Sequence, residues 1–245
     1  MIYPKHVWLI PDWNRTWARN NWYPKFSGHL QWFNTVINLT KYIFGETWIQ
    51  VFTVWWLSTE NSKGRDDEEL SYLFDLYKQV PQTLFNFLEE NKVNFRWIGK
   101  PDWLPSDLVD FLQEKEKQLD FESERFIIMA VNYWWRDEIS RGVRELTKEY
   151  MQVLESKDDI DKKVTDKSIE KDLENKLDLA WFPEIELVIR TKWEYAKRLS
   201  GFMLWWIWYA ELYFTKKYCP ELDKEEFEKA IEWFNSVYEA RNFGK

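Results

Sequence analysis

Short apolar runs alternate with longer amphipathic segments along the chain. Six of the runs are continuous and rich in β-branched or aromatic residues: residues 7–10, 49–57, 93–98, 126–131, 185–189 and 210–214. Runs of this kind are typical of strands that are buried on both faces of a sheet. We therefore expect a sheet of about six strands.

Between these runs, apolar residues recur every three or four positions, which is the spacing of a helix with one buried face. The helical pattern covers residues 30–44, 70–88 (around Pro81), 143–153 and 227–238. Regular alternation of strand and helix predicts an α/β fold, with a mainly parallel central sheet of about six strands that helices cover on both faces. We expect residues 1–245 to form a single domain.

Charge and cysteine content narrow the functional classes. The 34 basic and 42 acidic residues give a net charge of -8, which argues against a general nucleic-acid partner but leaves room for a local basic pocket. The single cysteine, Cys219, excludes an internal disulfide, and we expect a cytoplasmic location. The longest apolar stretch, residues 202–214, contains Glu211 and is too short to cross a bilayer, so we expect it to be buried.

The chain is rich in tryptophan and poor in glycine. It has 18 tryptophans and 7 glycines, whereas average usage would give roughly 17 glycines. Several tryptophans stand beside Asp, Asn, Pro or charged residues, where a tight turn ordinarily calls for glycine: Trp13, Trp22, Trp103, Trp134, Trp135 and Trp193. A core rich in aromatics is the alternative interpretation, but it does not account for all of them.

Polar clusters follow four of the apolar runs, at residues 12–17, 58–61, 132–137 and 190–200. The carboxyl ends of parallel strands gather along one edge of a sheet, so these clusters are expected to converge on one ligand. In the first cluster, Asp12 ends a strand and opens onto a helix, whose free N–H groups favour a phosphate. Each cluster alone has an ordinary alternative: a cap, a turn, or an ion pair between Arg190 and Glu194.

Motifs spread over nearly the whole chain carry a resemblance to a known family. They are residues 4–7 with 10–12 and Asn14, residues 28–29, residues 57–61 (LSTEN), residues 132–133 with 136–139, residues 189–191 with Glu194, residues 198–200 (RLS) and residues 209–214 (YAELYF). In this combination and order the chain resembles the cis-prenyltransferases, the undecaprenyl diphosphate synthase family. The trans-type synthases are excluded, because residues 66–69 and 158–161 lack their Asp-Asp-x-x-Asp pattern.

The resemblance implies prenyl chain elongation. An allylic diphosphate, farnesyl or geranylgeranyl, would lose its diphosphate, and isopentenyl diphosphate would attack the resulting carbon to give a cis-polyprenyl diphosphate. Mg²⁺ is the implied cofactor, with Asp12 and Glu211 as its ligands. Asp12 and Asn61 are the implied catalytic residues, and Asn61 occupies the family position that assists proton removal.

The resemblance also implies the residues that contact the two substrates. The allylic diphosphate would lie against Trp13, Asn14, Arg15, Thr16, Trp17, Lys25 and His29. The isopentenyl diphosphate would be held by Arg190, Arg198, Leu199 and Ser200, and the second motif would add Ser58, Thr59, Glu60 and Arg65. The helical segment 70–88 is either a wall of the tunnel for the growing tail or ordinary core.

The chain departs from the family pattern in the loops that would hold diphosphate. The family usually has glycine at Trp13, at Trp134 and Trp135 and near Trp193, and Ala196-Lys197 is a two-residue insertion. An indole in a phosphate loop fills space and disfavours positive φ, which raises a second hypothesis: a catalytically impaired or silent scaffold or partner subunit. A nucleotide-binding protein ranks last, because no glycine-rich phosphate motif follows a strand.

The resemblance finally implies how the chain associates with partners. We expect a homodimer, with residues 202–214 and 241–244 near its interface. Peripheral membrane contact through the lipid product is a further expectation.

Overall fold

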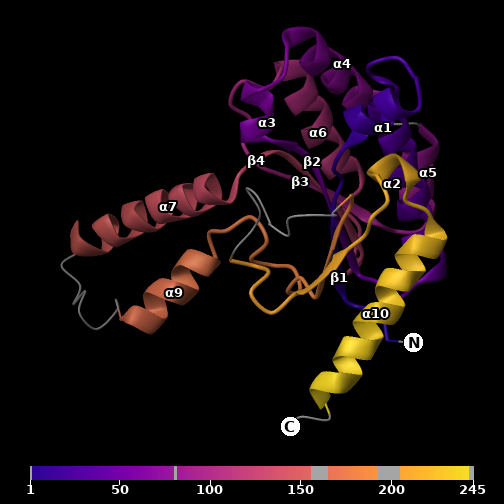
Figure 1. Cartoon of the computed structure of the whole chain (residues 1–245). Coiled ribbons are helices and arrows are strands. Elements are labelled where there is room, and N and C mark those ends of the chain that lie inside the picture. Colours follow the sequence, from indigo (N-terminus) through magenta and orange to yellow (C-terminus); the bar gives the residue numbers. More distant parts are fainter. Residues whose placement is uncertain (1, 80–81, 156–164, 193–204, 243–245) are drawn as a thin grey trace.

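A six-stranded parallel sheet forms the centre of the computed structural model, which describes residues 2–79, 82–155, 165–192 and 205–242 (Figure 1). The strand order is β3-β4-β2-β1-β5-β6, and each described pair of neighbours is parallel. The strands are β1 (His6–Ile10), β2 (Val51–Ser58), β3 (Asn94–Ile98), β4 (Phe126–Tyr133), β5 (Leu187–Arg190) and β6 (Glu211–Phe214). The predicted fold class is confirmed.

Helices connect the strands and cover the sheet. They are α1 (Asn14–Asn20), α2 (Ser27–Glu46), α3 (Thr59–Lys63), α4 (Asp67–Lys78), α5 (Gln82–Glu90), α6 (Ser106–Gln118), α7 (Trp135–Glu155), α9 (Asp166–Glu174) and α10 (Lys224–Asn242), with a short 3₁₀ turn η1 (Cys219–Glu221). Among the described residues, none of these helices combines the length and the apolarity that crossing a membrane requires.

Strand alternation divides the buried residues between two cores, one on each face of the sheet. In β1, Val7 and Leu9 belong to one core and Trp8 and Ile10 to the other. The first core contains buried residues of α2, α4, α5, α6 and α10. The second core lies under α7 and α9 and the segments that flank β5. Burial on both faces explains why the strands have continuous apolar sequences.

Helices α7 and α9 lie side by side and project away from the sheet (Figure 1). The Tyr150 hydroxyl donates to Asp172 at 2.8 Å, and Lys176 pairs with Glu149 at 2.5 Å, so polar contacts join the two elements. The charged run at residues 155–176 therefore contains a solvated helix, α9; residues 156–164 lie outside the described part of the chain.

Three details differ from the sequence prediction. The segment 70–88 forms two helices, α4 and α5, because Pro81 lies between them. Helix α6 was not predicted, since only Leu108 and Leu112 are buried on it and its apolar signal is short. The expectation that residues 202–214 are buried is wrong for Trp208 and Tyr209, which are exposed, because turns at 205–209 direct only part of the segment inward.

Candidate active site

A cavity of about 640 Å³ opens at the carboxyl edge of the sheet, where β1, β2 and β5 end. It is lined by Pro11, Asp12, Trp13, Asn14, Arg15, Thr16, His29, Trp55, Ser58, Glu60, Asn61, Gly64, Arg65 and Arg190. The structure therefore brings together most of the predicted site residues, from segments far apart in the sequence.

Asp12 and Arg190 form a direct ion pair in this cavity. The Arg190 Nε group donates to Asp12 Oδ2 at 2.7 Å, and the Asp12 backbone N–H donates to Thr191 Oγ1 at 2.8 Å. Strand register explains the pairing, because Ile10 of β1 lies directly opposite Arg190 of β5. The Arg190 side chain is almost fully buried and that of Asp12 is partly exposed, so the carboxylate can be reached from the cavity.

A second charged cluster surrounds Glu69, which sequence reasoning did not identify. Glu69 is fully buried on α4 and accepts hydrogen bonds from His29 Nε2 at 3.1 Å and from Arg15 Nη1 at 3.2 Å. Arg65 Nε lies 3.2 Å from Oε1, the oxygen that His29 also contacts, whereas Arg15 contacts Oε2. Three cavity-lining donors therefore share one buried acceptor. The available sequence signal was Arg65 at i−4 of Glu69 on a helical pattern, which is ambiguous by itself.

The charges of this cluster follow from its burial and its partners. Burial acts to raise the pKa of Glu69, but the hydrogen bond from His29 and the charges of Arg65 and Arg15 outweigh it and lower that pKa. Burial, together with the arginines, lowers the pKa of His29 despite the contact with Glu69, so this imidazole is neutral at pH 7. Two guanidinium groups against one carboxylate leave this part of the cavity positive.

One donor of the cluster is buried without an acceptor. Among the described residues, the Arg65 Nη1 group is inaccessible to solvent and has no hydrogen-bond partner. A buried unpaired donor costs on the order of 1–3 kcal/mol. An anion in the cavity would supply the missing acceptor.

Gly28 sets the position of His29 at the cavity. A Cβ atom at residue 28 would lie 2.0 Å from the backbone oxygen of Asn14, so only glycine permits α2 to approach α1 this closely. The Gly-His pair of the sequence motif thus has a steric reason. Gly28 allows α2 to pack closely against α1, and His29 lines the cavity.

The sequence motifs at residues 57–61 and 132–133 are joined by hydrogen bonds of Asn132. The Ser58 hydroxyl accepts from the Asn61 N–H at 2.8 Å and caps α3, which places both residues in the cavity lining. The Thr59 hydroxyl donates to Asn132 Oδ1 at 2.9 Å, and Asn132 Nδ2 donates to the backbone oxygens of Lys100 and Asp102 at 2.9 and 3.0 Å. Asn132 therefore joins the end of β4 to the segments that follow β2 and β3.

Several predicted site residues lie outside the cavity lining. Trp17 stacks on Tyr23 with ring centroids 5.3 Å apart, and Lys25 pairs with Asp66 at 2.8 Å on the surface. Thr59 donates its hydroxyl hydrogen bond to Asn132. Residues 193–204 lie outside the described part of the chain, and with them the predicted Arg198, Leu199 and Ser200, Glu194, Trp193 and the Ala196-Lys197 insertion.

Glu211 also does not line the cavity. It begins β6 opposite Leu187, three residues before the level of Arg190. At about 3.3 Å per residue, this offset is on the order of 10 Å along the strands. Within the described chain, Glu211 therefore lies outside the cavity lining, and its role as a second metal ligand stays a prediction from the resemblance.

The described residues contain no group of three or more His, Cys, Asp or Glu side chains that could hold a metal ion. Mg²⁺ is commonly bound by one or two carboxylates together with substrate phosphates. The Asp12 carboxylate, open to the cavity, fits that mode.

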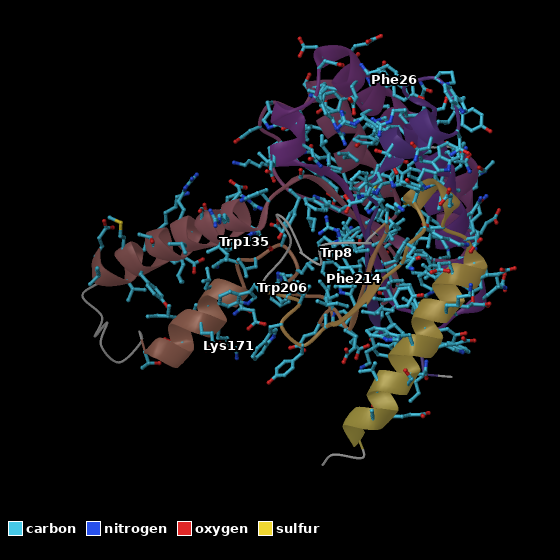
Figure 2. All side chains as sticks on the ribbon, in the orientation of Figure 1. Trp8, Phe26, Trp135, Lys171, Trp206 and Phe214 are labelled. Atoms are coloured by element: carbon cyan, nitrogen blue, oxygen red, sulfur yellow. The ribbon has the colours of Figure 1, made fainter. Side chains whose placement is uncertain are left out.

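A different buried acid, Glu138 of α7, lies in the second core. It accepts from the backbone N–H of Asp178 at 2.8 Å and from the indole of Trp206 at 3.4 Å, and Tyr133 donates its hydroxyl to it. Figure 2 shows Trp206 close to the sheet end of α7. Burial and the charge of Asp178 raise the pKa of Glu138 to about 7. Arg141 forms two hydrogen bonds with Asp178, at 3.0 and 2.6 Å.

Comparisons with known proteins agree with this geometry. The family model described as "Putative undecaprenyl diphosphate synthase" matches residues 10–244. The chain is 34% identical over 242 residues to an isoprenyl transferase of Aquifex aeolicus, covering 99% of this chain and 96% of the relative. It is 31% identical over 243 residues to a farnesyl-diphosphate-specific undecaprenyl diphosphate synthase of Aliivibrio fischeri, covering 99% and 89%. Lavandulyl diphosphate synthase of Lavandula x intermedia, solved with dimethylallyl diphosphate, has a similar structure, with a TM-score of 0.81, 26% identity and 94% coverage of each chain.

Proposed function

The chain belongs to the undecaprenyl diphosphate synthase family of prenyltransferases, and on this basis we propose that it elongates prenyl chains. It condenses isopentenyl diphosphate with an allylic diphosphate, farnesyl or geranylgeranyl, to give a cis-polyprenyl diphosphate. The observation that carries the proposal is the shared cavity, in which the Asp12–Arg190 pair and the cations around Glu69 lie together.

The cationic side chains bind the diphosphate groups. Arg15 and Arg65 line the cavity and exceed the charge of their single partner Glu69, and Arg190 adds a third guanidinium. Guanidinium groups suit phosphate because their planar N–H forks match pairs of oxygen atoms. Arg198 and Ser200 remain proposed ligands of isopentenyl diphosphate on the resemblance alone.

Asp12 is the residue of the described chain that would hold Mg²⁺. The ion, when bound, would supply positive charge to stabilise the departing diphosphate. Arg190 orients the carboxylate through its 2.7 Å hydrogen bond, and Thr191 fixes the Asp12 backbone. Glu211 as a second ligand stays a prediction from the resemblance.

Asn61 and Ser58 lie beside the reacting carbons. Both line the cavity, and the cap between them fixes the start of α3. The Asn61 amide does not ionise near neutral pH, so its contribution to proton removal is to orient the proton's acceptor by hydrogen bonding rather than to act as the base.

The apolar tail of the product enters between α2 and α4. A smaller cavity of about 40 Å³ shares the Asp12 and His29 wall and is lined further in by Trp32, Trp56 and Leu73. The rings of Trp32 and Trp56 meet edge to face, with centroids 5.2 Å apart. We propose that these two indoles, which line the smaller cavity, limit the length of the tail, so product size is an informative readout of the assay below.

The homodimer remains a proposal, and one surface supports it. Strand β6 is the last strand of the sheet, and the exposed rings of Trp208 and Tyr209 lie against each other just before it, 4.3 Å apart. Exposed aromatics beside a sheet edge are typical of an interaction surface. Light scattering of the purified chain tests this proposal. Peripheral membrane contact through the product is proposed on chemical grounds alone.

The experiment that tests the function is incubation of the purified protein with radiolabelled isopentenyl diphosphate, farnesyl or geranylgeranyl diphosphate, and Mg²⁺. We expect labelled polyprenyl product, and a loss of about 10²–10³-fold for Asp12→Asn, because charge stabilisation in the transition state is removed. Asp107→Asn is the matched control, since Asp107 forms an exposed ion pair with Lys78 away from the cavity.

A folded protein that gives no product with either primer would contradict this proposal. That result would favour the silent scaffold, which the names of the curated relatives do not favour. Full activity in Asp12→Asn would separately contradict the role given to Asp12.

A further inference from the structure

Three tryptophans adopt a backbone conformation that suits glycine. Trp13, Trp22 and Trp103 have φ values of 72°, 59° and 58°. Positive φ is uncommon for any side chain and a clear outlier for a bulky one, and the residues that tolerate it best are Gly, Asn and Asp. Among the described residues, three of the six non-glycine residues with positive φ are tryptophan. Backbone preference cannot produce that concentration.

Trp22 occupies the position after a helix that glycine usually fills. The Tyr23 N–H donates to the Ala18 oxygen at 2.9 Å, and the Trp22 N–H donates to the Arg19 oxygen at 3.2 Å. This pair of bonds after α1 is the Schellman motif, with Trp22 at its left-handed C′ residue. The indole is 95% exposed, so packing does not compensate for the conformation.

Trp103 occupies the third position of a tight turn. The Leu104 N–H donates to the Pro101 oxygen at 3.1 Å, which closes a four-residue turn over Pro-Asp-Trp-Leu. Positive φ at the third residue is the feature of type II turns, which call for glycine or asparagine at that position. An indole at this position is again the residue type that the geometry least favours.

Trp13 lies between Asp12 and α1, at the residue that precedes the helix. Its φ of 72° and ψ of 25° are left-handed, and its side chain makes no capping hydrogen bond. The residue lines the large cavity directly beside Asp12. The indole therefore occupies space at the wall where a small residue would leave room for a ligand.

The composition of the chain also indicates tryptophan at positions that suit glycine. The chain has 18 tryptophans and 7 glycines, against roughly 17 glycines expected from average usage. Further indoles are strongly exposed among the described residues, at Trp48, Trp181 and Trp208. Tryptophan is one of the residues that gains most from burial, so this many solvent-facing indoles is unusual.

We propose that Trp13, Trp22 and Trp103 are positions at which the protein made in its source cell carries glycine. The mechanism that links these two residues is the codon UGA, a stop signal in the standard code that different bacterial codes read as tryptophan or as glycine. The proposal rests on backbone geometry and composition, and it is independent of the proposed reaction. It also accounts for a bulky side chain in the cavity wall of a family whose members are synthases.

The direct test is peptide mass spectrometry of the protein purified from its source organism, together with the codons of its gene. We expect UGA codons and glycine masses at positions 13, 22 and 103. Trp17, which lies within α1 and stacks on Tyr23, is the internal reference for a tryptophan with a structural role, and we expect UGG there. Tryptophan masses in the three peptides overturn the proposal.

A physical test uses recombinant protein with the printed sequence. We expect Trp22→Gly and Trp103→Gly each to raise the melting temperature by about 2–4 °C, because a left-handed conformation is relieved. Trp17→Gly, in the helix interior, is the matched control and should lower it. A lower melting temperature for both Trp22→Gly and Trp103→Gly overturns the proposal. Neither readout depends on prenyl transfer, so failure here is distinct from failure of the proposed function.

Discussion

Glu69 and Glu138 are both buried glutamates on helices that follow the sheet's strands, yet their surroundings act in opposite directions. Glu69, beside the cavity, contacts His29, Arg15 and Arg65, and its pKa is lowered. Glu138, in the core on the other face, has neutral donors and a nearby Asp178, and its pKa is raised to about 7.

The difference shows that burial alone does not set the charge of a carboxylate. Desolvation acts to raise the pKa of both residues, and at Glu69 the hydrogen bond from His29 and the charges of Arg65 and Arg15 reverse its effect. The ionised glutamate is the one that holds cations in place for an anionic ligand. The other glutamate exchanges a proton near neutral pH and joins α7 to the segment before β5.

Removing the charge at Glu69 should give the largest effect. Glu69→Gln leaves Arg65 and Arg15 without their buried counter-charge, so we expect a loss of about 4 kcal/mol in the free energy of unfolding, with a raised KM for the allylic diphosphate. Urea unfolding and steady-state kinetics measure the two quantities. Glu68→Gln is the matched control on the same helix, because its side chain is 78% exposed and should change stability by less than about 0.5 kcal/mol. Equal losses of unfolding free energy for Glu69→Gln and Glu68→Gln would contradict the role given to Glu69 as a buried counter-charge.

The second-largest effect should be a pH dependence of the free energy of unfolding that differs between Glu138 and Glu69. Because folding raises the pKa of Glu138 from 4.5 to about 7, the folded state binds the extra proton, and this residue's contribution falls as pH rises through that range. The size is up to about 3 kcal/mol. We expect the free energy of unfolding of the parent, minus that of Glu138→Gln, to fall by about that amount from pH 5 to pH 8.

Taking the difference cancels other titrating groups in that window. Burial lowers the pKa of His6 to about 4, which adds stability as pH rises from 4 to 6.5 in both proteins. Glu69, with its lowered pKa, loses its contribution only as pH falls below its ordinary value of 4.5. A parent-to-variant difference that stays constant from pH 5 to pH 8 would show that Glu138 is ionised throughout.

The smallest effect should distinguish the two arginines of the Glu69 cluster. The Arg65 side chain is 15% exposed and that of Arg15 is 58% exposed. Lysine cannot reproduce the guanidinium fork, so we expect Arg65→Lys to weaken diphosphate binding by about tenfold, the equivalent of one charged hydrogen bond, and Arg15→Lys by about twofold. Calorimetry with inorganic diphosphate gives both values. A larger loss for Arg15→Lys would place the ligand nearer the rim than proposed.

Much of the fold could be predicted because parallel strands buried on both faces have a distinctive sequence. All six apolar runs became strands, and the long helices α2, α7 and α10 followed the apolar spacing. Helix α6 escaped prediction because so little of it is buried. The exposure of Trp208 could not be foreseen, since it depends on a bend rather than on the apolarity of the segment.

The cavity could be predicted in part, because strand ends converge by topology. That rule placed Asp12, Ser58 and Arg190 together. It could not give the strand register, which pairs Glu211 with Leu187 and so offsets it by three residues from Arg190. Glu69 was missed because its role depends on three partners from α1, α2 and the turn before α4. No local sequence pattern contains all of them.

The junction at Asn132 has a consequence for distant substitutions. Its side-chain amide is hydrogen-bonded at one end to Thr59, next to the cavity-lining residue Ser58, and at the other to the backbone oxygens of Lys100 and Asp102. The 101–104 turn, although outside the cavity lining, therefore shares a rigid support with the first turn of α3. We expect a change in that turn to be passed through Asn132 to the cavity-lining residues at the start of α3, so turnover can respond to a residue outside the cavity lining.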